Sequence, residues 1–281
     1  MIATRRVRPD KAAMWLLALP MGLIALSTIY PIFFTINIAA KTRKEYILDR
    51  FAISHTFYWE NFSSAWEQSH MQDYFLNSVI TTAGAVFLLL LVSSLAGYAF
   101  GCMRFKGRRL LFYLCLIGLM VPVQVILVPF YKLILDLHLL NKHAGLILSY
   151  TAFFLPFCTY LMTSFYAGIP REIIESAKLD GASLWMVYLR IILPMGKPAL
   201  LSLGILNTLY CWNDVLISLL VMQERDKRTL MVGVTSLRGE FSTNVPQFAA
   251  GVILSVLPVI VVFLIFQRQI AKGITVGAVK G

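Results

Sequence analysis

The stretch Pro170–Pro194, PREIIESAKLDGASLWMVYLRIILP, is a charged, helix-forming segment between two long apolar runs. It holds three acidic and three basic residues, although charged residues make up only 14% of the whole chain. A soluble globular domain has about 25% charged residues. The contrast predicts that the flanking runs lie in a lipid bilayer and that this stretch lies outside it.

Six apolar runs predict an all-α polytopic membrane protein. The chain has 281 residues, of which 58% are hydrophobic, and its mean hydropathy is +0.74. A membrane-spanning helix needs roughly 20 apolar residues, and the runs do not alternate as the strands of a membrane barrel do. The six predicted spans cover residues 12–40, 74–103, 110–131, 145–169, 198–213 and 241–267. The fifth run continues beyond Asp214 to residue 223, so that span is expected to tolerate the acid.

The spans divide the chain into an ordered series of segments. A cytoplasmic segment, residues 1–11, precedes the first span, 12–40, and an outside loop, 41–73. A five-helix core covers residues 74–267 and contains the charged stretch, 170–194, as a cytoplasmic loop, and a cytoplasmic tail, 268–281, follows. The first span is longer than the 7–15 apolar residues of a typical signal peptide, so it is predicted to be an uncleaved anchor.

The distribution of Lys and Arg predicts the orientation. With both termini in the cytoplasm, the inside segments hold 15 basic and 4 acidic residues, whereas the outside segments hold 10 and 9. Basic residues concentrate on the cytoplasmic side of membrane proteins. Topology thus accounts for the net charge of +11, and no nucleic-acid partner is expected; the surrounding partner is membrane lipid.

Neither cysteine nor histidine spacing indicates a metal site or a disulfide framework. No two cysteines form a C-x-x-C pair, and a cysteine in an apolar run commonly behaves as a small buried hydrophobe. The histidines lack the spacing of metal ligands and are assigned no role. These residues are Cys102, Cys115, Cys158 and Cys211, and His55, His70, His138 and His143.

No motif for ATP hydrolysis is present in the sequence. A phosphate-binding loop requires G-x-x-x-x-G-K-[ST]. The pair Gly196-Lys197 has Ile191 where the first Gly is needed and Pro198 where Ser or Thr is needed. We therefore expect that the chain is not an enzyme, that it binds no cofactor itself and that it has no catalytic residue.

Local signals in the opening stretch predict two short helices joined by an elbow. Pro170 suits the first helical position, and Gly181 suits a helix C-terminus. Ser183 suits the N-cap of a second helix, which is expected to end where Pro194 interrupts it. An exposed amphipathic helix pair fits a groove in another protein; the alternative is an interfacial helix lying on lipid.

The same stretch resembles the cytoplasmic motif of binding-protein-dependent ABC importer permeases. That motif reads E-A-A, three residues, G, nine residues, I-x-L-P. The chain matches its spacing throughout and departs only at Ser176, where the family has Ala. The matching residues are Glu175, Ser176, Ala177, Gly181, Ile191, Leu193 and Pro194.

The resemblance implies the family's six-helix permease fold with a cytoplasmic coupling helix that inserts into a separate ATPase subunit. ATP and Mg would bind to that ATPase, and closure of the ATPase dimer would switch the pathway from inward-open to outward-open. The implied partners are a companion permease, two ATP-binding subunits and an extracytoplasmic sugar-binding protein. The implied location is the bacterial cytoplasmic (inner) membrane.

Further stretches resemble the carbohydrate branch of these permeases, the maltose type, and its shorter six-helix partner. Examples are LNSVITT at 76–82, MVPVQVILVPFYKLI at 120–134 and the tail QRQIAKGITVGAVKG at 267–281. Its glycines and lysines alone indicate a flexible, solvated tail. The resemblance implies instead that the tail reaches the ATPase dimer interface through Lys272, Gly273, Thr275, Gly277 and Lys280.

The stretch YCWNDVL, residues 210–216, provides candidates for a solute pathway. Charged residues within spans usually face a cavity or a partner, and sugar hydroxyls need polar partners. Trp212, Asn213 and Asp214 cannot all point inward, since neighbours on a helix lie about 100° apart; Asn207 can share a face with Asp214. The alternative is that these polar residues join this helix to its neighbours.

Together these features predict the permease subunit of an ATP-driven sugar importer, forming half of the translocation pathway. One alternative is an importer permease for a polyol or a glycerol-phosphate ester. The other, from a different class, is a standalone secondary carrier or channel. The scarcity of titratable residues inside the spans disfavours the carrier, because proton-coupled transporters often need them.

Overall fold

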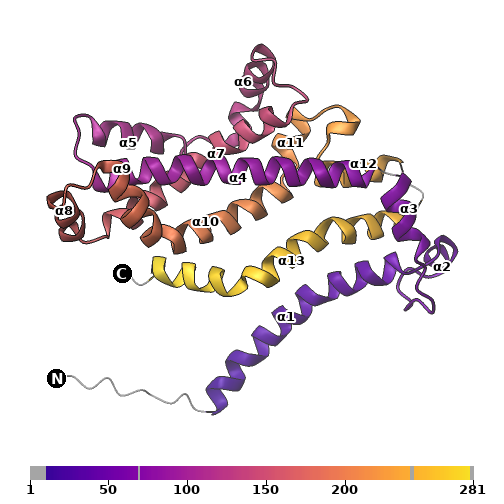
Figure 1. The fold of residues 1–281 in the computed structure, drawn as a ribbon. Coiled ribbons are helices and arrows are strands. Elements are labelled where there is room, and N and C mark those ends of the chain that lie inside the picture. The colour runs from indigo at the N-terminus through magenta and orange to yellow at the C-terminus, as the bar shows by residue number, and fades with distance from the viewer. Residues whose placement is uncertain (1–10, 69, 241–243, 279–281) are drawn as a thin grey trace. The chain divides into compact units, whose positions relative to one another are not determined.

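A computed structural model of the chain describes residues 11–68, 70–240 and 244–278, and within these ranges every regular element is a helix (Figure 1). The chain forms two compact units. The smaller comprises residues up to 66 together with 237–254, and the larger comprises 67–236 together with 255–281. The all-α prediction is confirmed.

The smaller unit contains the first predicted span and most of the outside loop. Its first helices are α1 (Lys11–Ala39), α2 (Arg43–Leu48) and α3 (Glu60–Gln68). Asn61, which is buried, donates hydrogen bonds from Nδ2 to the carbonyl oxygens of Ala39 at 2.8 Å and Lys41 at 2.7 Å. Thr42 and Glu45 form a capping box at the start of α2. These bonds give the loop after α1 a defined conformation.

The larger unit is built around two helices that pack closely together. They are α4 (Met71–Cys102) and α7 (His143–Ala167). A Cβ at Gly97 would lie 2.6 Å from Met162 Cβ, and one at Gly101 would lie 3.0 Å from the Thr163 carbonyl oxygen. Small residues four apart allow membrane helices to approach in this way. The Gly97–Gly101 spacing therefore determines the contact on which the rest of this unit is assembled.

The third predicted span is not a single helix. Residues 110–131 are divided between α5 (Arg108–Ile117) and α6 (Val123–Asp136). Pro122 is the N-cap of α6, and it has no N–H with which to continue a helix from α5. In the described residues, five helices rather than six are long and apolar enough to cross a membrane: Ala18–Ala39, Met71–Cys102, His143–Ala167, Leu184–Asn213 and Val245–Gln267.

The prediction that the fifth span continues beyond Asp214 is wrong. Helix α10 (Leu193–Asn213) ends there, and a separate helix, α11 (Leu216–Val221), follows. The Asp214 carboxylate accepts the backbone N–H groups of Ser218 at 2.9 Å and Ile217 at 3.4 Å. An acid that satisfies the free N–H groups of a new helix favours a break at that point.

Three elements follow α11 in the described residues. They are the short helix η2 (Arg225–Lys227), α12 (Leu230–Glu240) and α13 (Val245–Ala278). The flexible tail expected from its glycines is helical instead, because α13 continues through Gly273 and Gly277. A glycine costs about 1 kcal/mol relative to alanine inside a helix, which does not by itself end one. Lys280 lies outside the described residues.

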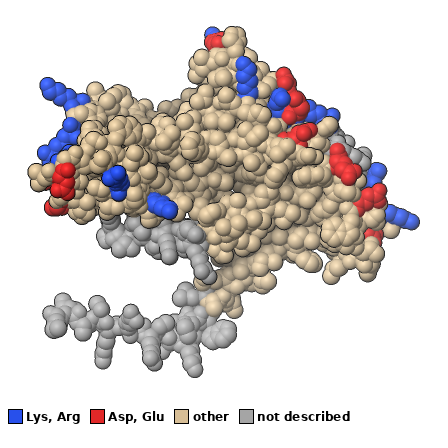
Figure 2. Space-filling model, in the orientation of Figure 1, with Lys and Arg blue, Asp and Glu red and all other residues tan. Residues whose placement is uncertain are grey.

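Charged side chains gather at the two ends of the larger unit, with an uncharged band between them on the face shown in Figure 2. At the end where α4 finishes, the exposed acids are Glu172, Glu175 and Asp180. The exposed bases there are Arg104, Lys106, Arg109, Arg171, Lys178, Arg190 and Lys197. Basic side chains therefore outnumber acidic ones at this end of the larger unit.

Candidate coupling loop and transport pathway

The first helix of the loop, α8 (Arg171–Leu179), is anchored on one side and open on the other. Ile174 is buried and packs in the same apolar cluster as Val187 and Tyr188. Glu175 and Ser176 are exposed, and Leu179 is 89% exposed. Pro170 precedes the helix as its N-cap, with ψ of 131°, and is not its first residue as predicted. The chain leaving α7 is extended at Pro170, and the helix can begin only after it.

The elbow is a Schellman motif centred on Gly181. The N–H of Gly181 bonds to the Lys178 carbonyl oxygen, and the N–H of Ala182 bonds to that of Ala177, both at 3.0 Å. Gly181 has φ of +82°, a conformation that costs other residues roughly 1–2 kcal/mol. Ser183 Oγ then accepts the N–H of Met186 at 3.2 Å and caps the next helix. Both local predictions, the glycine stop and the serine cap, are confirmed.

The second helix does not end at Pro194, so that prediction is wrong. Helix α9 (Leu184–Val187) passes through a π-helical turn, η1 (Tyr188–Ile192), directly into α10. The N–H of Leu193 bonds to the Tyr188 carbonyl oxygen, five residues back. Pro194 thus stands directly after the π turn, where the regular helical hydrogen-bond pattern is already interrupted and a missing N–H is accommodated. The loop is therefore continuous with a predicted span.

The elbow presents a mixed surface of acidic and large apolar side chains. Exposed apolar groups close together on an otherwise charged loop are typical of a surface that contacts another protein or a membrane. Of the motif residues, Ala177, Ile191 and Leu193 are half-buried, and the others are exposed. The large apolar residues are Leu179, Leu184, Trp185, Met186 and Leu189, which are 42–89% exposed.

Two of the predicted pathway residues are engaged in contacts between helices. Asn207 is buried, and its Nδ2 donates to the Leu203 carbonyl oxygen at 2.8 Å and to Cys158 Sγ of α7 at 3.2 Å. Trp212 donates from Nε1 to the Ser255 carbonyl oxygen at 3.2 Å. Both side chains therefore join α10 to a neighbouring helix.

The other two pathway candidates lie at the end of α10. Asp214 is half-buried and accepts the hydroxyl of Tyr150 at 3.0 Å, in addition to the N–H groups of α11. Asn213 is exposed, and its Nδ2 donates only to the Leu209 carbonyl oxygen among the described contacts, at 2.8 Å. The four candidates therefore do not converge on one point.

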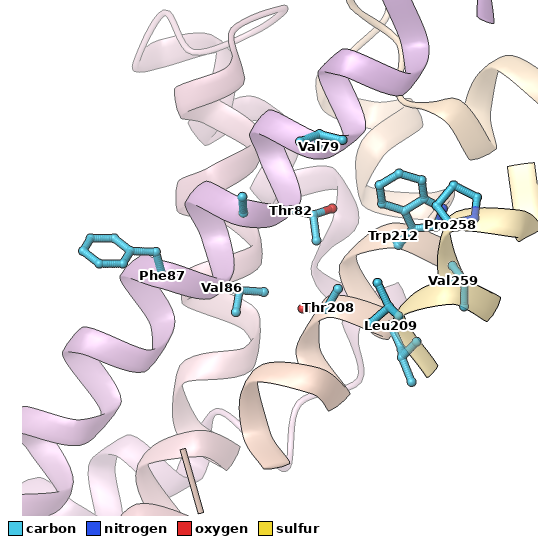
Figure 3. A pocket seen from close by; sticks show the side chains of 11 residues that line it. Val79, Thr82, Val86, Phe87, Thr208, Leu209, Trp212, Pro258 and Val259 are labelled. Carbon is cyan, nitrogen blue, oxygen red and sulfur yellow. The ribbon is translucent and has the colours of Figure 1, made fainter. Parts of the chain in front are cut away.

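A cavity of about 370 Å³ lies between α4, α10 and the part of α13 in the larger unit (Figure 3). Its hydroxyl-bearing lining residues are Thr82 and Thr208, and Thr208 donates to the Gly204 carbonyl oxygen at 2.8 Å. The other lining residues are Val79, Ala83, Val86, Phe87, Leu209, Trp212, Pro258, Val259 and Val262. The Thr82 hydroxyl has no partner in the described part of the chain, but the rest of the lining could replace few of the hydrogen bonds that a sugar makes with water, so this cavity does not suit a sugar.

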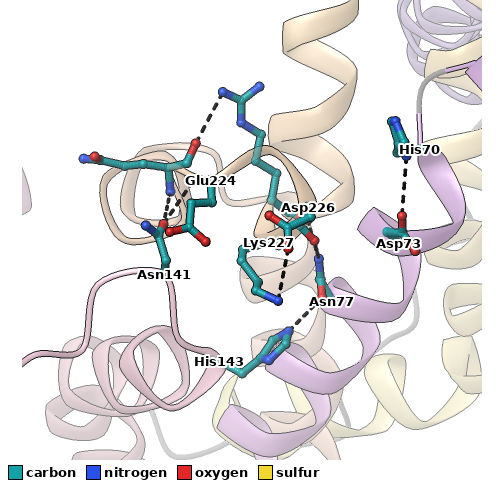
Figure 4. Close-up of polar contacts among 10 residues, drawn as sticks. His70, Asp73, Asn77, Asn141, His143, Glu224, Asp226 and Lys227 are labelled. Carbon is teal, nitrogen blue, oxygen red and sulfur yellow. Dashed lines mark hydrogen bonds and ion pairs between the residues drawn. The ribbon is translucent and has the colours of Figure 1, made fainter.

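A polar network at the other end of the larger unit was not anticipated from the sequence (Figure 4). Asn77 donates from Nδ2 to the carbonyl oxygens of Asp226 at 2.8 Å and Arg228 at 3.1 Å. Its Oδ1 lies 2.7 Å from His143 Nε2. The sequence does show Asn77 as an amide near the start of an apolar run. A polar side chain in such a run needs a polar partner, and this is the signal that could have predicted the network.

Asn141, in the turn before α7, also holds the segment that follows α11. Its Oδ1 accepts the N–H groups of Gln223 at 2.7 Å and Glu224 at 3.0 Å (Figure 4). The segment after α11 is therefore held by side chains of α4 and of the turn before α7. This gives the end of the larger unit opposite the elbow a defined shape.

The chain is similar to known permeases over most of its length. It is 36% identical to a probable ABC transporter permease, YurM, of Bacillus subtilis, over 92% of this chain and 85% of that protein. It is 32% identical to the diacetylchitobiose uptake permease NgcG of Streptomyces coelicolor, over 90% and 84%. It is 36% identical to the arabinooligosaccharide permease AraQ of Bacillus subtilis, over 74% and 73%.

The fold also matches a solved structure, a bacterial ABC transporter for import of the acidic polysaccharide alginate. The TM-score is 0.81, with 93% of this chain and 98% of that chain covered and 21% sequence identity. The family model of the binding-protein-dependent transport system inner membrane component matches residues 93–276. The elbow at Gly181 fits the same family. The match to this family model and the permease relatives show that the chain belongs to the binding-protein-dependent inner-membrane transport components, the ABC importer permeases.

Proposed function

We propose that this chain is the permease subunit of an ATP-driven oligosaccharide importer and forms half of its translocation pathway. The observation that carries the proposal is the elbow at Gly181, which presents Glu175 on α8 and a group of exposed apolar side chains on α8 and on α9, the helix that is continuous with a span. The sugar class is supported by the relatives named for diacetylchitobiose and for arabinooligosaccharides.

Coupling to a separate ATPase follows from the shape of the loop. Helix α8 is short and exposed apart from Ile174 and Ala177, so it can enter a cleft without unfolding the rest of the loop. Glu175 would meet a basic or polar group there, and Leu179 and Trp185 would bury apolar surface. ATP and Mg would bind to the ATPase, and closure of its dimer would displace the loop.

The complex would contain a companion permease, two ATP-binding subunits and an extracytoplasmic binding protein. A solved alginate importer of this fold is in complex with a periplasmic protein carrying an alginate pentasaccharide, which supports the last of these partners. The basic end of the larger unit supports a cytoplasmic position for the elbow, and both termini would then be cytoplasmic. The protein would lie in a bacterial inner membrane.

The C-terminal tail is a second proposed contact with the ATPase. The apolar part of α13 ends at Gln267, and the helix continues to Ala278. At 1.5 Å per residue the extension projects about 16 Å beyond the apolar segment. Lys272, Gly273, Thr275 and Gly277 lie on this extension, and Lys280 follows it, so the tail is long enough to reach a subunit bound at the membrane surface.

For the pathway we propose separate roles for the four candidates. Asn213 is exposed at the end of α10 and would line the route of the solute. Asn207, Trp212 and Asp214 would hold α10 in place, because their polar atoms bond to α7, α13 and α11.

Another relative favours a second solute class. The chain is 31% identical to a sulfoquinovosyl glycerol permease of Agrobacterium fabrum, over 79% of this chain. A glycerol glycoside or polyol is therefore the second candidate. An anionic solute requires a cationic group, and none occurs between Pro198 and Asn213, so a neutral oligosaccharide remains the first candidate.

Reconstitution tests the proposal. Vesicles would contain this chain with its companion permease, ATPase and binding protein, and would receive diacetylchitobiose, raffinose, arabinotriose and glycerol in turn. We expect ATP-dependent uptake of one of the three oligosaccharides. ATP-dependent uptake of glycerol, above its passive diffusion into vesicles without protein, would favour the polyol candidate. Flux of an oligosaccharide through the chain without an ATPase would establish a standalone carrier or channel.

A further inference from the structure

Three buried hydroxyl groups meet where the loop joins the spans. Ser94 Oγ of α4 lies 2.8 Å from the hydroxyl of Tyr166 of α7 and 2.9 Å from that of Tyr188 in the π turn η1. The side chains of all three residues are buried, with exposures of 1%, 0% and 3%. These residues, Ser94, Tyr166 and Tyr188, are called the hydroxyl cluster below. Three elements distant in the sequence are thus connected through one serine oxygen.

The surroundings of the hydroxyl cluster fix the position of each ring. A Cβ at Gly196 would lie 2.5 Å from Tyr166 Cε1 and 2.7 Å from its hydroxyl oxygen, so α10 has glycine where this ring crosses it. The ring of Tyr98 lies 5.4 Å from that of Tyr188, and its hydroxyl donates to the carbonyl oxygen of Leu184, the first residue of α9, at 3.2 Å. The cluster is therefore held by packing from α4, α7 and α10.

The hydroxyl cluster is directly connected to the loop. Tyr188 follows α9 without a break, and Ile174 of α8 packs in the same apolar cluster as Tyr188 and Tyr166. Apolar contacts are non-directional and allow neighbouring surfaces to slide. Hydrogen bonds are directional, and a buried hydroxyl that loses its partner is costly. Separation of the loop from α4 would break the Ser94–Tyr188 bond and leave the buried Tyr188 hydroxyl without its partner, whereas the Ser94–Tyr166 bond between α4 and α7 would remain. The Ser94–Tyr188 bond, more than the apolar packing, therefore opposes movement of the loop relative to α4.

We propose that the hydroxyl cluster is the joint that transmits a displacement of the 170–194 loop to α4 and α7. Ser94, Tyr166 and Tyr188 are positioning residues in this account, since none of them touches the ATPase or the solute. The inference rests on the proposed function, in which an ATPase displaces the loop. It adds that the displacement passes through Ser94 and does not pass only along the backbone from α9 into α10.

Pulsed electron–electron double resonance, which measures the distance between two spin labels, tests the joint in the assembled complex. Nitroxides carried on unnatural residues at Leu91 of α4 and Lys178 of α8, both exposed, leave the native cysteines in place. If the joint holds, the distance between the labels is unchanged when ATP and vanadate trap the closed ATPase. In Ser94→Ala or Tyr188→Phe, the distance distribution broadens on trapping and its mean shifts by several ångström.

Two comparisons make the result specific. Tyr160→Phe removes an exposed hydroxyl from α7 and is expected to behave as the parent protein does. Ser94→Ala and Tyr188→Phe together are expected to shift the distance no further than Ser94→Ala alone, because Ser94→Ala already removes the bond that Tyr188→Phe removes. Ser94→Ala leaves both rings in place, so it serves as the test if Tyr188→Phe does not assemble.

The outcomes separate this inference from the function on which it rests. An unchanged distance in the parent and in both variants, or a distance that already shifts in the parent, overturns the joint. A second pair of labels, at Lys178 and on the ATPase subunit, reports docking of the loop. If that pair shows no short distance in the parent complex, the proposed function fails, whatever the first pair shows.

Discussion

Ala182 donates its backbone N–H to the carbonyl oxygen of Ala177 across the elbow at Gly181, at 3.0 Å. This bond joins the end of α8 to the residue before the N-cap of α9. It is backbone to backbone, so the relative direction of the two helices depends on the conformation of the chain and little on side chains. The loop can therefore act as a single body when it meets a partner.

Replacement of Gly181 by alanine should disrupt that geometry. At φ of +82°, the substitution costs about 1–2 kcal/mol and favours conformations in which the bond between Ala182 and Ala177 is lost. We expect weaker co-purification with the ATPase and lower ATP-dependent uptake. Gly107 provides a matched control, because its φ is +83° and a Cβ there also meets nothing within 4 Å. Equal losses in Gly107→Ala and Gly181→Ala would show a general stability effect and no special role for the elbow.

Reversal of the charge at Glu175 tests the proposed docking contact. The side chain is exposed on α8, so Glu175→Lys should leave the fold intact. We expect loss of ATPase co-purification and of uptake, because a repulsive charge in a buried interface costs several kcal/mol. Glu172→Lys, also exposed and on the same helix, should have the smaller effect. Normal co-purification and uptake in Glu175→Lys would remove Glu175 from the interface.

Truncation of residues Thr275–Gly281 tests the tail. The deletion removes the end of α13 and none of the apolar segment that ends at Gln267. Coupled ATPase activity should fall while assembly with the companion permease is retained. Replacement of the same residues by a Gly/Ser segment of equal length should also lower the activity. If that replacement restores full activity, length alone matters and the tail makes no specific contact.

Two substitutions at Asp214 separate a structural role from contact with the solute. Asp214→Ala removes the acceptor for Tyr150 and for two N–H groups of α11, and we expect it to lower the free energy of unfolding by about 1–3 kcal/mol. Asp214→Asn retains an acceptor oxygen and should lose less. Thermal unfolding of the purified complex measures both. If the Asp214→Asn variant keeps the melting temperature of the parent complex but loses uptake, Asp214 lies in the solute pathway instead.

Local signals predicted the elbow correctly because each depends on one or two neighbouring residues. Gly181 adopts a positive φ, and Ser183 caps the helix that follows it. Proline was harder to interpret. Pro194 lies within a helix that continues through a π turn, whereas Pro122 separates α5 from α6, and nothing in the surrounding apolar residues distinguishes the two situations.

Contacts between distant residues were beyond prediction from one sequence. Ser94 lies 72 residues from Tyr166 and 94 from Tyr188, and Asn77 lies 149 from Asp226. Ser94 and Asn77 appear in the sequence only as polar residues within apolar runs. Burial requires a partner for such a group, but only the packing of α4 against α7 and α10 determines which partner it finds.

The most direct test is disulfide cross-linking between the loop and the ATPase. Ser176→Cys places a thiol on the exposed side of α8, to be paired with single cysteines along the cleft of the ATPase subunit, and the parent chain with its native cysteines gives the background. The account predicts a cross-link at one cleft position that stops ATP-dependent oligosaccharide uptake and is reversed by a reductant. The absence of any cross-link while uptake remains normal would contradict it.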